Sequence, residues 1–137
     1  MTKRAILFLT LFLVASNVLV AQDSEDKARF AAEQWIVLVD DGQYDQSWKE
    51  AAKAFQDTIS SSDWEKKVSA QRTQLGSKES RKLKEIKSTN AAKGLPAGQY
   101  VLVRYQSSYE KKKAALETIT AVREGDGQWR VIAYEIN

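Results

Sequence analysis

DDGQYDQSW, residues 40–48, separates two segments that both have the apolar spacing of a helix. Gly42 is a typical helix terminator, because glycine adopts the left-handed backbone without steric cost. The carboxylate of Asp45 can accept hydrogen bonds from the free amides that open the next helix. Tyr44 and Trp48 are large enough to hold the corner. A connection this short predicts two helices that pack against each other as neighbours.

Upstream of the corner, the sequence predicts a helix over residues 24–41. Its apolar residues recur at helical spacing and are Ala28, Ala31, Ala32, Trp35, Leu38 and Val39. The run WIVLV within it is also compatible with a strand, but the upstream alanines continue the helical register. Downstream, a second helix is predicted from the stripe Trp48, Ala51, Ala52 and Phe55. A third begins at the capping box SDWE, Ser62 to Glu65, and ends at Gly76.

After Gly76 the apolar period changes to two, which is typical of strands. The predicted strands cover residues 80–88, 99–108, 114–123 and 128–136. A cationic loop is predicted at 109–113, and turns at GLPAG and GDG. Simple alternation in the last strand places Val131 on one face and Tyr134 on the other. Helices grouped before strands indicate an α+β fold: three N-terminal helices packed on a curved four-stranded antiparallel sheet.

The first 21 residues have the order of a secretory signal peptide. Lys3 and Arg4 precede an apolar run that ends near Ala21, and acidic residues follow at once. The run is short for a membrane span of roughly 20 residues, although a retained anchor is the alternative interpretation. We therefore expect a signal peptide at 1–21, a single domain at 22–137, and an exported protein, periplasmic or secreted, with no membrane attachment after cleavage.

Composition excludes several classes of site. The chain has no cysteine and no histidine, so disulfides, histidine-based triads and zinc sites of the usual type are absent. Without Lys3 and Arg4, 19 basic residues face 18 acidic ones, a net charge of +1. Nucleic-acid binders need a concentrated cationic field, so we expect no nucleic-acid partner. The three lysines at 111–113 are interpreted as a solvated loop tip rather than a lipid or polysaccharide contact. We expect no metal and no cofactor.

Several phrases together resemble a known family. They are DDGQYDQSW, WEKKVSAQRTQLG with the following SRKL, LPAGQYVLVRYQSSYEKKKAALETIT and DGQWRVIAYEI. The combination is similar to domain of unknown function 4019, an exported bacterial family without an assigned activity. The order of helices and strands also resembles the nuclear transport factor 2-like superfamily, whose members form a cone.

The resemblance implies a set of candidate site residues. Enzymes of that superfamily, such as ketosteroid isomerase, place carboxylates, tyrosines and arginines inside the cone. The corresponding residues here are Glu117 as general base, with Arg104, Tyr100 and Tyr134 as helpers. The alternative interpretation is that Glu117 forms an ordinary ion pair with Arg104 or Arg72.

The tryptophans allow two interpretations as well. Trp48 and Trp64 could line a ligand pocket, or they could supply buried area to a small domain without disulfides. The full set of candidate pocket residues is Trp48, Trp64, Arg72, Tyr100, Arg104, Glu117 and Tyr134.

The sequence favours a non-enzymatic module that binds a small-molecule ligand or an envelope protein. A small enzyme that uses Glu117 as base is the alternative. A homodimer is left open, and the identity of the ligand does not follow from the sequence.

Overall fold

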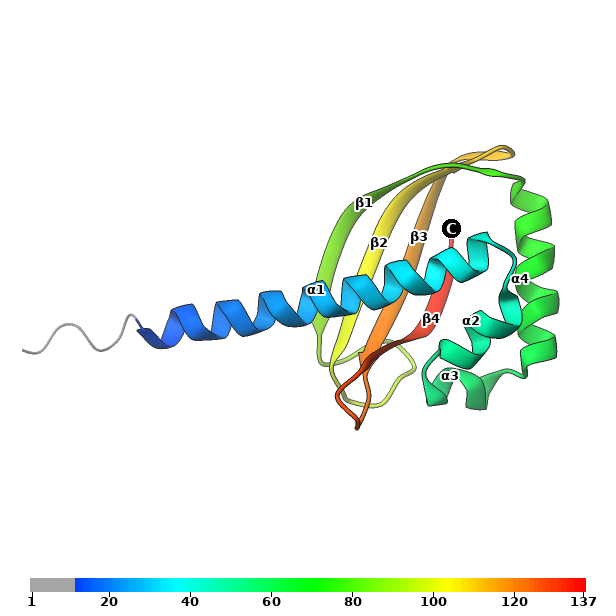
Figure 1. The fold of residues 1–137 in the computed structure, drawn as a ribbon. Helices are drawn as coiled ribbons and strands as arrows, with labels where there is room; N and C mark the ends of the chain where they lie inside the picture. The colour runs from blue at the N-terminus through cyan, green and yellow to red at the C-terminus, as the bar shows by residue number, and fades with distance from the viewer. Residues whose placement is uncertain (1–11) are drawn as a thin grey trace, which may run out of the picture.

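The computed structural model describes residues 12–137, in which four helices precede a four-stranded sheet (Figure 1). The helices are α1 (Phe12–Asp40), α2 (Tyr44–Glu50), α3 (Lys53–Thr58) and α4 (Ser61–Leu75). The strands are β1 (Lys78–Thr89), β2 (Tyr100–Tyr109), β3 (Lys112–Arg123) and β4 (Trp129–Ile136). The order β1-β2-β3-β4 is antiparallel throughout. The predicted α+β class and four-stranded antiparallel sheet are confirmed, but the predicted number of three helices is wrong.

The sheet curves around α1, which crosses its inner face and contacts all four strands (Figure 1). The predicted signal peptide lies largely outside the residues whose side chains are described; α1 begins within it, at Phe12. No helix in the described part of the chain is both long and apolar enough to cross a membrane.

The helix corner forms where DDGQYDQSW predicts it. Gly42 has φ +74°, and the Gln43 amide donates to the Leu38 carbonyl at 2.8 Å, which closes the end of α1. The predicted cap by Asp45 is wrong, because α2 already begins at Tyr44. Asp45 instead accepts a hydrogen bond from the Ser61 hydroxyl at 2.8 Å.

The second predicted helix is broken into α2 and α3 by two alanines. Ala51 has an extended backbone, with φ −72° and ψ 164°. The Ala52 amide donates to the Val131 carbonyl of β4 at 2.8 Å, and both alanines are buried. The chain thus exchanges a helical hydrogen bond for one to the sheet, which the helical stripe in the sequence could not reveal.

The N-cap of helix α4 lies two residues before the start of the predicted capping box. Ser60 is the N-cap, and its hydroxyl accepts a hydrogen bond from the Asp63 amide at 3.1 Å. The predicted cap at Ser62 is therefore wrong, whereas the predicted end at Gly76 is confirmed. The cationic loop is shorter than the predicted range of 109–113. Strand β2 runs to Tyr109 and β3 starts at Lys112, so only residues 110–111 connect them.

Ser47 is fully buried and joins three helices. The Trp35 indole donates to the Ser47 carbonyl at 2.7 Å, and the Trp64 indole donates to the Ser47 hydroxyl at 2.9 Å. The two indole rings lie 5.8 Å apart, and Phe55 meets Trp64 edge-on at 5.1 Å. A residue as small as serine lets α2 approach both indoles, so the corner stretch fixes the packing of three helices.

A bulge in β4 changes which residues face this core. Ala121 pairs with Val131, but Thr120 pairs with Ala133, so Ile132 is an extra residue. Tyr134 therefore lies on the same face as Val131 and opposite Ile119. The alternation predicted for the last strand is wrong beyond Ile132, and the bulge brings Tyr134 inside.

Candidate functional site

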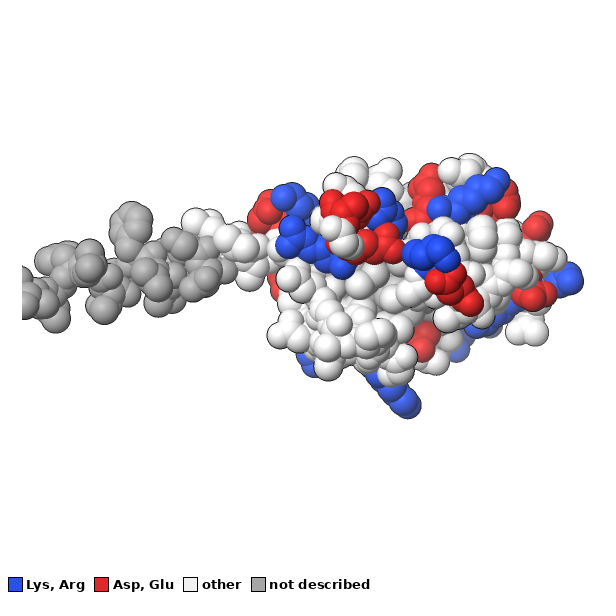
Figure 2. Space-filling model, turned by 90° about the horizontal axis from the view of Figure 1, so that it is seen from below, with Lys and Arg blue, Asp and Glu red and all other residues white. Residues whose placement is uncertain are grey.

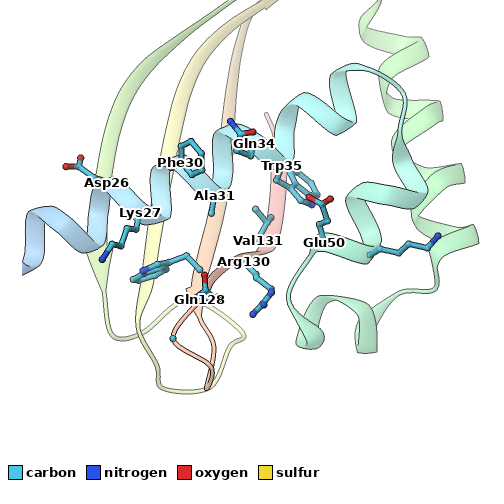
Figure 3. A pocket seen from close by; sticks show the side chains of 13 residues that line it. Asp26, Lys27, Phe30, Ala31, Gln34, Trp35, Glu50, Gln128, Arg130 and Val131 are labelled. Carbon is cyan, nitrogen blue, oxygen red and sulfur yellow. The ribbon is translucent and has the colours of Figure 1, made fainter.

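An open groove runs along α1 and is the candidate binding site (Figure 3). It has a volume of about 860 Å³ and is bordered by α1, α2, the turn between β3 and β4, and the start of β4. Its apolar surface comes from Phe30, Ala31, Trp35, Trp129 and Val131. Phe30 is 64% exposed, so most of its apolar ring is in contact with water.

Polar side chains also border the groove. Gln34 and Gln128 are both exposed. Asp26, Lys27, Lys49, Glu50 and Arg130 supply charge. The cations are already paired within the protein: Lys27 with Asp23 at 2.7 Å, Lys49 with Asp45 at 2.5 Å, and Arg130 with Asp126 at 2.9 Å.

A second site, the buried ion cluster, consists of Asp40, Arg72, Arg81, Glu117 and Tyr134. Glu117 is 0% exposed. Arg81 donates to its two carboxylate oxygens at 3.0 and 3.1 Å, and the Tyr134 hydroxyl donates to one of them at 2.7 Å. The bidentate arginine and the tyrosine together satisfy the carboxylate without solvent.

Asp40 ties the same cluster to the end of α1. It accepts hydrogen bonds from Arg81 at 2.6 and 3.0 Å, from Arg72 at 2.8 Å and from Lys78 at 2.9 Å. Arg72 also donates a hydrogen bond to the Tyr134 hydroxyl at 2.9 Å. Residues from α1, α4, β1, β3 and β4 are therefore joined through five side chains.

The charges fix the protonation states of both carboxylates. Burial by itself would raise the pKa of Glu117, but hydrogen bonds and charge from Arg81 outweigh it and hold that pKa below its ordinary value. Burial likewise opposes ionisation of Asp40, and hydrogen bonds from Arg81 and Lys78 still lower its pKa to about 2. Burial next to Glu117 raises the pKa of the Tyr134 hydroxyl. At neutral pH both carboxylates are ionised and Tyr134 keeps its proton.

The structure brings together Arg72, Glu117 and Tyr134 of the candidate residues. The predicted pairing of Glu117 with Arg104 is wrong. Glu117 is paired with Tyr105, the neighbour of Arg104, so Arg104 lies on the other face of the sheet, where it binds Glu85. The pairing with Arg72 is indirect and passes through Tyr134. Arg81, which binds Glu117 directly, was not among the candidates.

The remaining candidates are dispersed. Trp64 lies in the core, and Trp48 packs against that core while its indole donates to the Ile59 carbonyl at 2.8 Å. Tyr100 belongs to a separate cluster with Ala52 and Ile132, and its hydroxyl donates to the Pro96 carbonyl at 2.6 Å. None of the seven candidate residues borders the groove along α1.

The fold and these two sites define an α+β domain with an open groove on one side and a neutralised ion cluster inside. The profile of the family described as Protein of unknown function (DUF4019) matches residues 31–134. The chain belongs to this family. No curated protein and no solved structure matches the chain significantly.

Proposed function

We propose that the chain is an exported, non-enzymatic binding module whose ligand or envelope partner occupies the groove along α1. The observation that carries the proposal is the 64% exposure of Phe30 on the wall of an open groove of about 860 Å³. Leaving a large apolar ring in water is unfavourable, and a ligand that covers it would gain the corresponding free energy.

The fold proposed for this module is the nuclear transport factor 2-like cone. Its support is the arrangement in Figure 1, where the sheet curves around α1 and the other helices lie at one side. Export is supported by the charged, apolar and then acidic order of residues 1–26.

The environment of Glu117 favours binding over the isomerase-like alternative. A general base that works near neutral pH needs a raised pKa and access to a substrate proton. Glu117 has a lowered pKa, is fully buried and already accepts hydrogen bonds from Arg81 and Tyr134. We therefore assign it a structural role.

The surface charge is consistent with a partner other than nucleic acid. Figure 2 shows basic and acidic side chains lying beside each other, with uncharged surface between the groups. The face shown in Figure 2 lacks the continuous positive field that attracts phosphates.

The groove can be tested by NMR. Isotope-labelled protein, produced from the full chain and recovered after export, is titrated with a small-molecule extract of a bacterial envelope. We expect shifts of the backbone signals of Ala31, Gly127 and Gln128, which border the groove. Shifts confined to other parts of the protein would contradict the assigned site.

The same preparation tests export. We expect mass spectrometry to find the recovered chain beginning at or near Gln22, because processing should follow Ala21. Recovery of the chain only from the cytosol, with Lys3 and Arg4 still attached, would refute the proposed localisation.

A further inference from the structure

We propose that the groove along α1 binds a neutral carbohydrate chain. This inference rests on the proposed function and deepens it by naming the class of ligand. Three properties of the groove support it: the charge of its border, the aromatic surfaces, and the kind of polar groups beside them.

The charge of the groove favours a neutral ligand. Lys27 and Lys49 each form an ion pair with an aspartate four residues earlier in the same helix. Arg130 is held by Glu124 at 2.6 Å and by Asp126 at 2.9 Å. An anionic ligand would have to compete with these carboxylates, so the cations provide little net attraction.

The aromatic residues provide flat apolar surfaces at the solvent boundary. Phe30 is 64% exposed, and Trp129 is partly buried against the core, which fixes its ring. One face of a pyranose ring carries mainly C–H groups, and such a face can lie on an aromatic ring while the hydroxyls stay at the edge. The apolar contact then removes the exposed surface of Phe30 from water.

The polar groups match the hydroxyls of a sugar. The amide side chains of Gln34 and Gln128 can each donate and accept, as a hydroxyl can. Glu50 accepts from Gln46 at 2.8 Å through one carboxylate oxygen, and Asp26 accepts from Gln22 at 3.2 Å through one oxygen. A carboxylate has lone pairs for more than one donor, so both can still accept from ligand hydroxyls.

The groove is open to solvent rather than closed. Figure 3 shows the side chains that line it, including Phe30 and Ala31 from α1 and Arg130 and Val131 from β4. A volume of about 860 Å³ lies near the upper end of the range for small-molecule sites. Several sugar units fit this shape, and a longer chain can leave the groove at its open side.

The test uses a defined panel of neutral tetrasaccharides: cellotetraose, maltotetraose and tetra-N-acetylchitotetraose. Binding to the protein is followed by NMR and by tryptophan fluorescence. We expect at least one of them to bind and to shift the signals of Ala31 and Gln128. Phe30→Ala should weaken that binding about tenfold, whereas Val37→Ala should change it less than about twofold. Val37 is the matched control, because it is 50% exposed on the same helix and does not border the groove.

Two further ligands separate this inference from the proposed function. If tri-galacturonate, an acidic oligosaccharide, bound at least about tenfold more tightly than every neutral one, the argument from paired charges would be wrong. If no saccharide bound but an amphipathic helical peptide shifted the NMR signals of the groove, the carbohydrate proposal would be refuted. The proposal that the protein is a binding module would stand. If neither the saccharides, the peptide nor the envelope extract bound, both proposals would fail.

Discussion

Replacing Arg81 with methionine is expected to lower the free energy of unfolding by about 3–5 kcal/mol, because it removes one partner of a buried ion pair. Arg81 binds both Glu117 and Asp40, each through two hydrogen bonds. Methionine retains most of the apolar stem, so the loss reports the charge and the hydrogen bonds. Glu117, at 0% exposure, would be left ionised without its cation or forced to bind a proton.

Arg104→Met is the matched control for this variant. Arg104 also pairs with a glutamate across neighbouring strands, but its partner Glu85 and the arginine itself are both partly exposed. A solvent-exposed ion pair contributes about 0–1 kcal/mol, so this variant should remain close to the parent. Urea unfolding followed by circular dichroism measures both. Equal, small losses for the two arginines would show that the buried ion cluster does not hold the elements together.

Trp64→Ala is also expected to lower the free energy of unfolding by about 3–5 kcal/mol, because the truncation leaves a cavity in the core. Trp64 is 3% exposed, packs against Trp35 and Phe55, and donates to the Ser47 hydroxyl. Truncation therefore removes aromatic contacts with two helices and leaves a buried hydroxyl without its donor. The same chemical unfolding measurement, read by circular dichroism because fluorescence changes with the tryptophan content, gives the loss.

Phe30→Ala provides the contrast. An exposed side chain on the groove wall contributes little packing, so its loss should change stability by less than about 0.5 kcal/mol. A stable Trp64→Ala protein with altered ligand binding would instead place Trp64 in a pocket, as one interpretation of the sequence had it. The two variants thus separate the core aromatics from the groove aromatics.

Local patterns in the sequence predicted the larger elements well. Gly42 and Gly76 end α1 and α4 because their left-handed backbones follow directly from residue type. The last three strands follow from period-two alternation, whereas the first is weakly patterned. The antiparallel order follows because no helical segment separates the strands, as a parallel sheet would require. The break at Ala51 and Ala52 could not be predicted, because its cause is a hydrogen bond to Val131 on β4, far along the chain.

The candidate site depended on contacts of still longer range. Glu117 and Tyr134 were identified from the resemblance, yet the bulge at Ile132 is what places them on one face. Arg81 lay among lysines in a weakly apolar strand, and its partners Asp40 and Glu117 come from α1 and β3. Nothing in its neighbours distinguishes it from a solvated cation. The groove was missed for a similar reason, since Phe30 fell outside the helical stripe.

We assign Glu117 a structural role, which favours a binding module over an isomerase. The most direct test of this role is a carbon NMR titration of the Glu117 side-chain carboxyl. Hydrogen bonds and charge from Arg81 hold its pKa low in the folded state, so we expect a midpoint below the ordinary value of about 4.3. The stabilisation that this provides is complete above that ordinary value and is lost as the pH falls through the folded midpoint. A midpoint at about 6 or higher would contradict the account and support a general base.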